Sequence, residues 1–309
     1  MGGGSLKVIC GPTAGGKSAL VAELALRFPL TVLSADSRQV YRGFDIGTAK
    51  PTAAERWRVP HDLIDLIEGT ETFSAAAWAA AAEERLAAVR AEERIPVVVG
   101  GTGFYIKALV DPLFEAPALD PQRRKVLALE LAPLTTDALR LEVERVDPRR
   151  AHLGRAQLLR SIEFVRLTGE PISEWHERAR KAGGHRARYL VVDPGAVLAE
   201  RIPERVTRML EQGWEGEVAA LTERLPREAP AWNATGYEMI RELVEGRITR
   251  EAAIERVAIA TRQYAKRQRT WFRHQLPEGA VTLLDPGAPN ALDLALLWWM
   301  ADDDGGIGA

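Results

Sequence analysis

Residues 11–18 read GPTAGGKS and follow the apolar run LKVIC at residues 6–10. The pattern G-x-x-x-x-G-K-[ST] between a strand and a helix is typical of a loop that wraps around phosphate oxygens. Its glycines allow a close backbone approach, Lys17 supplies a positive charge, and the Ser18 hydroxyl is a ligand for Mg²⁺. The sequence therefore predicts a phosphate and magnesium site, with these residues: Gly11, Pro12, Thr13, Ala14, Gly15, Gly16, Lys17 and Ser18.

A loop of this kind in an ATP-hydrolysing enzyme is accompanied by an apolar strand that ends in Asp and holds the metal ion. The best candidate for that strand, within residues 95–101, instead runs into GGTGFY at residues 100–105. Asp36 ends a different apolar run and lies within SADSRQVYRG. This arrangement disfavours ATP hydrolysis as the activity.

Asp36 begins the segment DSRQVYRGFDIGTAKP, which we expect at the same edge of the sheet as the phosphate loop. A carboxylate there could accept a proton during a reaction, cap a helix or assist a magnesium ion. Arg38 and Gln39 carry hydrogen-bond donors that suit a base edge or a phosphate. Thr102, in the glycine loop at residues 100–105, adds a hydroxyl. Three such loops at one edge predict an active site.

The elements that position these loops follow from the alternation of apolar runs with helical patterns, which indicates an α/β fold with a parallel sheet. We expect strands at residues 6–10, 30–36, 95–101, 188–194 and 280–286. Helices are expected at residues 17–27, 73–93 and through much of 197–275.

Residues 116–182 lack strand-like runs and are rich in Arg, Leu and Glu, which predicts a helical insertion into the α/β fold. The chain would then return to the sheet. We therefore expect a first part of the core at residues 1–115, the insertion at 116–185, and the rest of the core at 186–309.

The net charge of −2 over 309 residues shows that the whole chain is not a polycation, so any contact with nucleic acid must be local. The single cysteine, Cys10, excludes an intrachain disulfide, and we expect it to be buried. It fits a reducing compartment, and no signal peptide or membrane span is recognised. These features predict a cytoplasmic protein.

Residues 261–274 contain no acidic residue and place four cations at helical spacing: Arg262, Lys266, Arg269 and Arg273. Such a stripe could follow the phosphates of an RNA, although a solvated helix face would have the same pattern. Tyr264 and Trp271 offer rings that could stack on bases.

Four segments taken together are similar to the bacterial tRNA dimethylallyltransferases. They are GPTAGGKS, SADSRQVYRGFDIGTAKP, VVVGGTGFYIKAL and TRQYAKRQRTWFR, in this order, and the similarity runs from about residue 6 to about residue 275. The resemblance implies an α/β fold in which a P-loop parallel sheet is flanked by helices and carries a helical insertion domain. It also implies transfer of the prenyl group of dimethylallyl diphosphate to N6 of adenosine 37 in tRNA.

The resemblance further assigns roles to residues. Asp36 would be the general base on N6, and Thr102 would act with Thr13, Lys17 and Ser18 on the diphosphate, which Arg262 would join. The target base would contact the run from Asp36 to Gln39: Asp36, Ser37, Arg38 and Gln39. The insertion would embrace the anticodon stem-loop, with Arg160 in contact with tRNA. A monomer is implied.

The chain departs from the pattern of these enzymes at a few positions. Ala156 and Gln157 stand where Gln and Arg are usual, Gly15 replaces a Ser, and Asp62 follows His61 where a second His is usual.

Three other functions fit parts of the sequence. A P-loop kinase of a small metabolite would explain Lys17 and Ser18, but not the DSRQVYRG segment. An adenylate isopentenyltransferase would prenylate free AMP or ADP, although the insertion and the basic helix favour a macromolecular acceptor. A non-enzymatic RNA-binding protein would leave the three loops without a function.

Overall fold

The structure, a computed structural model, describes residues 4–111, 119–181 and 184–301. The chain forms two compact units, one of residues 1–110 with 185–309 and the other of residues 111–184. The domain boundary expected near residue 115 lies outside the described residues.

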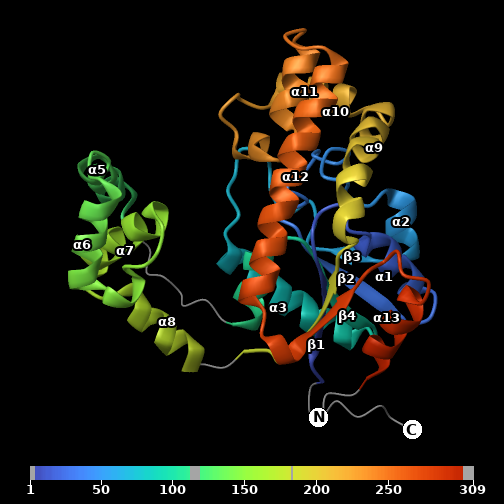
Figure 1. The fold of residues 1–309 in the computed structure, drawn as a ribbon, viewed down its shortest axis with the longest axis horizontal. Helices are drawn as coiled ribbons and strands as arrows, with labels where there is room; N and C mark the ends of the chain where they lie inside the picture. The colour runs from blue at the N-terminus through green and yellow to red at the C-terminus, as the bar shows by residue number, and fades with distance from the viewer. Residues whose placement is uncertain (1–3, 112–118, 182–183, 302–309) are drawn as a thin grey trace. The chain divides into compact units, whose positions relative to one another are not determined.

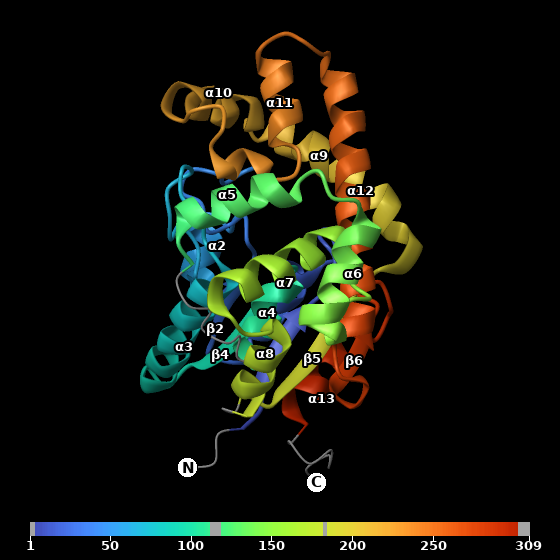
Figure 2. The same ribbon diagram turned by 90° about the vertical axis from the view of Figure 1, so that its left-hand side faces the viewer.

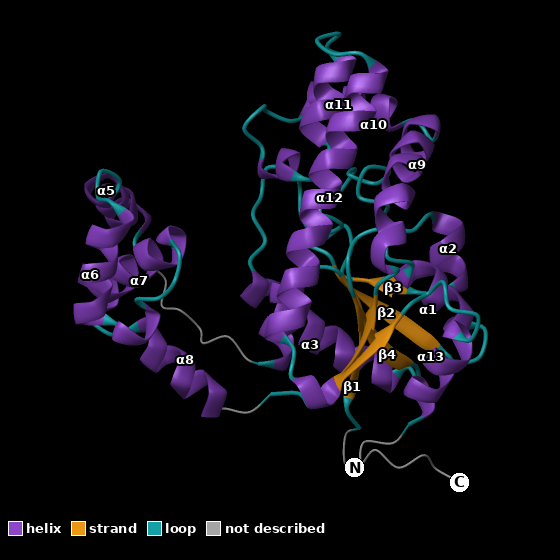
Figure 3. Cartoon of the chain, in the orientation of Figure 1, coloured by secondary structure: helices purple, strands orange, loops and turns teal. Residues whose placement is uncertain are grey.

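One parallel sheet forms the centre of the first unit (Figure 3). Its strands in the described residues are β1 (Leu6–Cys10), β2 (Leu30–Ala35), β3 (His61–Asp62), β4 (Ile95–Gly100), β5 (Ala187–Val192) and β6 (Val281–Leu284). Their order is β3-β2-β4-β1-β5-β6, and every pairing is parallel. The parallel α/β sheet predicted from the sequence is confirmed.

The register brings the carboxyl ends of four strands to one level. Gly100 pairs with both Cys10 and Ala35, and Cys10 pairs with Val191. The loops that follow β1, β2, β4 and β5 therefore leave the sheet side by side. In open α/β sheets this edge is where ligands bind.

The central strands β1, β2 and β4 are buried on both faces, as their continuous apolar runs require. Helices α1 (Lys17–Ala25) and α13 (Ala291–Met300) cover one face, where Leu24 and Trp298 pack among strand residues that include Ile9. Helices α3 (Ala75–Ala91) and α4 (Gly103–Val110) lie against the other face (Figures 1 and 2). Cys10 is buried in β1, as expected.

Beyond the sheet edge, four more helices of the first unit pack together, and the short helix α2 (Ala53–Arg58) lies near β3 (Figure 1). The four are α9 (Leu198–Glu211), α10 (Trp214–Arg224), α11 (Tyr237–Val244) and α12 (Arg250–Gln275). Trp214 and Tyr237 are fully buried between them. Thr249 caps the start of the 26-residue α12, accepting a hydrogen bond from the Ala252 N–H.

The edge strand β3 was not expected, and it explains the His61–Asp62 pair. His61 and Asp62 pair with Val32 and Leu33 of β2. The Asp62 carboxylate accepts a hydrogen bond from Arg85 Nε at 2.9 Å and so ties the strand to α3.

The second unit consists of α5 (Pro121–Leu131), α6 (Thr136–Val146), α7 (Arg155–Thr168) and α8 (Ile172–Lys181) in its described residues. Its core contains Leu139 and Leu158. Gln157, one of the departures noted above, caps α7, because its Oε1 accepts the Gly154 N–H at 3.1 Å. Among the described residues, no helix in either unit is long and apolar enough to cross a membrane.

Candidate active site

The phosphate loop takes the conformation that its glycines permit. Gly11 has φ 141° and Gly16 has φ 96°, and Ala14 also adopts a positive φ of 59°. A Cβ on Gly15 would lie 2.8 Å from the Pro12 oxygen, so the loop is closed tightly at that position. The N–H groups of Gly16, Lys17 and Ser18 donate to no other described backbone group. They form the open N-terminus of α1, which favours an anion.

Lys17 points back into its own loop. Its Nζ donates to the carbonyl oxygens of Gly11 at 3.0 Å and Pro12 at 2.7 Å. Burial lowers the pKa of Lys17 to about 8, against the opposing influence of the Asp36 charge. The loop therefore holds an ammonium group whose contacts are neutral carbonyls and whose charge an anion would stabilise.

Asp36 follows β2 and lies within the electrostatic reach of Lys17. Its Oδ1 accepts the Arg38 N–H at 2.8 Å, which fixes the turn after the strand. Thr102 Oγ1 accepts the Ser37 N–H at 3.0 Å and donates to Ser37 Oγ at 3.3 Å. The structure gives Asp36 Oδ2 no hydrogen-bond donor among the described residues, so this oxygen is left for an incoming proton. Asp36, Thr102 and Lys17 are thus brought together.

Arg205, on α9, belongs to the same cluster and was missed in the sequence. Its charge acts on Lys17, and the Asp36 charge acts on it. Burial lowers the pKa of Arg205, and among the described residues its guanidinium has no hydrogen-bond or ion-pair partner. No motif marks this arginine, because α9 is brought to the sheet edge by tertiary packing alone.

Tyr264, on α12, completes this side of the site. Burial, followed by the Asp36 charge, raises the pKa of Tyr264 to about 12, while a hydrogen bond with Thr102 acts in the opposite direction. The phenol therefore stays protonated at neutral pH. Its neighbours place the ring next to Thr102 and Asp36, while Arg267 lies over the ring at 5.7 Å.

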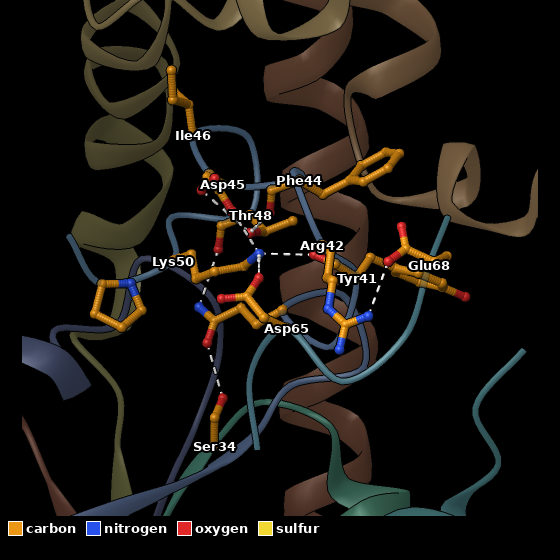
Figure 4. Close-up of polar contacts among 12 residues, drawn as sticks. Ser34, Tyr41, Arg42, Phe44, Asp45, Ile46, Thr48, Lys50, Asp65 and Glu68 are labelled. Atoms are coloured by element: carbon orange, nitrogen blue, oxygen red, sulfur yellow. Dashed lines mark hydrogen bonds and ion pairs between the residues drawn. The ribbon is translucent and has the colours of Figure 1, made fainter. Parts of the chain in front are cut away.

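The loop between β2 and β3 is held by a buried lysine (Figure 4). Lys50 Nζ donates to the Tyr41 carbonyl at 2.8 Å, to Asp45 Oδ1 at 2.5 Å and to Asp65 Oδ1 at 2.6 Å. The Lys50 side chain is 0% exposed. Lys50 therefore joins both ends of residues 41–50 to the segment before α3.

Gln39 closes the same loop from inside. It accepts a hydrogen bond from Ser34 Oγ at 2.9 Å, and its Nε2 donates to the carbonyls of Thr48 and Ala49 (Figure 4). Both ends of the amide thus have partners within the protein. The predicted contact of Gln39 with a target base stays a prediction, and in this structure the amide positions the loop.

The helices beyond the sheet edge hold the tip of this loop. The Glu217 carboxylate of α10 accepts the N–H groups of Asp45 at 3.0 Å and Ile46 at 2.6 Å. Tyr237 donates its hydroxyl to Glu217 at 2.6 Å. A Cβ on Gly47 would lie 2.2 Å from the Trp214 ring nitrogen, so only glycine fits there without a shift.

The glycines at residues 100, 101 and 103 leave room for neighbouring parts of the protein. A Cβ on Gly100 would lie 2.1 Å from the Ala35 oxygen, one on Gly101 2.1 Å from Gln268 Nε2, and one on Gly103 2.1 Å from the Trp271 ring. Their side-chain positions are filled by β2 and α12. This loop is glycine-rich because the protein packs closely on it.

Two of the four cations of the predicted stripe on α12 have partners within the protein. Arg269 donates Nε to Asp193 Oδ2 at 2.8 Å and also contacts the Gly195 carbonyl. Arg262, seven residues earlier, donates to the Ala199 carbonyl at 3.1 Å. Seven residues are about two helical turns, so both arginines face α9 and the loop after β5. The predicted contact of the stripe with an RNA stays a prediction.

The remaining cations of α12 face solvent. Lys266 and Arg273 are exposed and have no hydrogen-bond or ion-pair partner among the described residues. A hollow of about 400 Å³ is lined by residues on this side of the helix: Lys266, Arg267, Thr270, Trp271, His274 and Gln275. A cationic rim around a tryptophan suits a phosphate chain with an unstacked base.

Arg160 lies in the second unit, on α7. It pairs with Glu163 at 3.3 Å and lies over the Phe164 ring at 5.8 Å. The predicted contact of Arg160 with an RNA stays a prediction.

The described residues contain no group of three or more His, Cys, Asp or Glu side chains that could hold a metal ion. The oxygen donors near the phosphate loop include the exposed Ser18 hydroxyl and the Asp36 carboxylate. Hydroxyl and carboxylate oxygens that are completed by phosphate oxygens and water suit Mg²⁺.

Comparison with known proteins places these residues in a family. The family model described as IPP transferase matches residues 39–275. A tRNA dimethylallyltransferase of Thermus thermophilus is 40% identical over 291 residues, which cover 93% of this chain and 95% of that protein.

Two solved structures have the same fold. The full-length tRNA isopentenylpyrophosphate transferase of Bacillus halodurans is 34% identical with a TM-score of 0.64, covering 91% of this chain and 90% of that one. A eukaryotic dimethylallyltransferase acting on tRNA is 26% identical with a TM-score of 0.79, covering 96% of this chain and 78% of that one.

Replacing Lys50 by Met should destabilise the first unit by about 3 kcal/mol, because Asp45 and Asp65 would lose their buried cation. The measurement is the free energy of unfolding in urea. Lys107→Met is the matched control, because Lys107 makes one exposed hydrogen bond to Gln275, and its loss should cost less than about 1 kcal/mol. Equal effects of the two substitutions would contradict the role of Lys50.

The pKa of Lys17, about 8, predicts a pH dependence of anion binding. The ammonium group is charged below this pKa and neutral above it, so affinity for inorganic pyrophosphate should fall roughly tenfold between about pH 7 and pH 9. Calorimetric titration measures the affinity. Lys17→Arg keeps its charge over this range and corrects for the titration of pyrophosphate itself. Parallel pH profiles of the two proteins would contradict the prediction.

Proposed function

Because the chain belongs to the IPP transferase family, we propose that it transfers the dimethylallyl group of dimethylallyl diphosphate to N6 of adenosine 37 in tRNA. The family relatives are tRNA dimethylallyltransferases, and the chain is a prenyltransferase of this kind. The observation that carries the proposal is the meeting of Asp36, Lys17 and Arg205 at one edge of the sheet.

In the proposed reaction a C–N bond forms between N6 and the allylic carbon, and the bond from that carbon to the diphosphate oxygen breaks. The electron pair leaves with pyrophosphate. The exocyclic amine is a poor nucleophile until its proton is removed, and Asp36 Oδ2 accepts that proton. Thr102 and the Arg38 N–H keep the carboxylate turn in place.

The diphosphate is proposed to lie at the N-terminus of α1. The N–H groups of Gly16, Lys17 and Ser18 point to it, and Lys17 would exchange its loop carbonyls for phosphate oxygens. Arg205 supplies a second cation. These groups stabilise the negative charge that develops on the leaving group. The family resemblance adds Arg262, which would have to leave the Ala199 carbonyl.

Mg²⁺ fits the oxygen donors beside the loop, and Ser18 and the diphosphate would hold it. When bound, the ion would neutralise charge on the departing pyrophosphate.

The tRNA is proposed to contact the outer side of α12 through Lys266, Arg267 and Arg273, with Trp271 available for stacking. Extrusion of the target base from the anticodon loop would expose its N6 to Asp36. Arg160 and the second unit would grip the anticodon stem. We also propose that the protein acts as a monomer and in the cytoplasm, where buried Cys10 stays reduced.

Incubation with Mg²⁺, dimethylallyl diphosphate and unmodified tRNA should yield prenylated adenosine at position 37, detected by mass spectrometry after digestion. AMP in place of tRNA should yield none. Product with AMP alone would identify an adenylate prenyltransferase, and a product that requires ATP would identify a kinase.

Replacement of Asp36 by Asn should lower kcat by about 10²- to 10⁴-fold, since the amide cannot accept the N6 proton. The tRNA affinity should stay within about twofold, because the Asn side-chain oxygen still accepts the Arg38 N–H. Single-turnover transfer and filter binding measure the two quantities. Unchanged turnover would exclude Asp36 as the base.

A further inference from the structure

One buried amide joins the phosphate loop to the glycine loop. The Gln268 side chain of α12 is 6% exposed. Its Oε1 accepts the Thr13 N–H at 2.8 Å, and its Nε2 donates to the Gly101 carbonyl at 2.9 Å. The two bonds span 255 and 167 residues of sequence, so a single side chain connects the loops after β1 and β4.

The hydrogen bond from Thr13 to Gln268 decides which backbone N–H groups of the phosphate loop are open to a ligand. An N–H that donates to Gln268 does not point at a ligand, which leaves the anion to the N–H groups of Gly16, Lys17 and Ser18. The Gly15 N–H donates to Pro12 at 3.1 Å and tightens the same turn. Gln268 therefore fixes the Thr13 end of the loop, while the N–H groups of Gly16, Lys17 and Ser18 stay open.

The glycine loop is shaped to receive this amide. A Cβ at Gly101 would lie 2.1 Å from Gln268 Nε2, and one at Gly103 would meet the Trp271 ring. Backbone φ at Gly101 is not positive, so what glycine provides there is space for the Gln268 amide. Thr102, which holds the turn after Asp36, lies between these two glycines.

We propose that Gln268 is a positioning residue for prenyl transfer, which sets the phosphate loop against the Thr102–Asp36 side of the site from within α12. A buried glutamine that only satisfied its own polarity could bond within one element. Gln268 instead bonds to the phosphate loop after β1 and to the loop after β4, which carries Thr102. The inference rests on the proposed function, because the anion it concerns is the diphosphate of the prenyl donor.

Three variants separate this role from general stability. Gln268→Leu removes both hydrogen bonds, whereas Gln268→Glu keeps an oxygen for the Thr13 N–H and loses the donor to Gly101. Gln263→Leu is the matched control, because Gln263 is exposed on the same helix. For each protein the measurements are the melting temperature, the affinity for inorganic pyrophosphate, the affinity for tRNA, and kcat and KM for dimethylallyl diphosphate.

Gln268→Leu should weaken pyrophosphate binding and lower kcat/KM for dimethylallyl diphosphate by about 10²-fold, since small displacements of a site have such effects. Gln268→Glu should weaken pyrophosphate binding at least as much, because it also adds a negative charge beside the phosphate loop. The tRNA affinity should stay within about twofold, because the outer side of α12 is unchanged. Gln263→Leu should resemble the native protein in every measurement.

Native-like pyrophosphate affinity in either folded Gln268 variant would overturn the inference. If Gln268→Leu does not fold, Gln268→Ala takes its place, because it also removes both hydrogen bonds and adds no charge beside the anion site. Pyrophosphate binding does not depend on the identity of the acceptor. If the native protein binds pyrophosphate but does not prenylate tRNA, the proposed function is rejected. The comparison of pyrophosphate affinities among the variants still tests the role of Gln268.

Gly101→Ala tests the same contact from the other loop, because the added methyl would displace the Gln268 amide. It should weaken pyrophosphate binding as Gln268→Ala does. The double variant Gly101→Ala with Gln268→Ala should bind no more weakly than either single variant, since the methyl then occupies the space of the missing amide. If the affinity losses of the two single variants multiply in the double variant, the two residues do not act through one contact.

Discussion

The site depends on backbones that approach one another at the carboxyl edge of the sheet with no room for a side chain. A Cβ on Gly11 would lie 2.2 Å from the Val192 oxygen, and one on Gly100 would lie 2.1 Å from the Ala35 oxygen. The end of β1 is thereby pressed against β5, and the end of β4 against β2. Because four strands end at one level, residues far apart in sequence share a small volume, as catalysis by positioning requires.

Charge within this region is of two kinds. Lys50 and Arg269 contact carboxylates, and each of them fastens a loop. Lys17 donates only to carbonyls and Arg205 has no partner among the described residues, and burial lowers the pKa of both. The charges of Lys50 and Arg269 are compensated by carboxylates, and these two residues hold the structure together. The second kind has carboxylates nearby but no ion-pair partner among the described residues, which leaves it available to an anionic ligand such as a diphosphate.

The sequence predicted the features that depend on residues near one another in the chain. The glycine-lysine loop, the apolar strands and the capped helix at Ser74 follow from short-range chemistry, and the parallel sheet follows from their alternation. The position of Asp36 next to Lys17 followed from the rule that strand ends share an edge. The sequence did not predict the roles of Arg205 and Lys50 or the pairing of Arg269 with Asp193. Their roles depend on contacts made by tertiary packing, and no spacing in the sequence distinguishes an arginine that pairs with Asp193 from one that faces solvent.

Helix α12 shows why the contacts that the sequence did not predict matter for function. Different sides of this helix make different contacts. One side enters the site through Gln268, another is fixed to the loop after β5 through Arg269, and the outer side carries Lys266 and Arg267. A helix fixed on two sides moves as one body, so a substrate held on its outer side has a defined position relative to the phosphate loop. The distance between the prenyl donor and its acceptor would then be set by a rigid element of the fold.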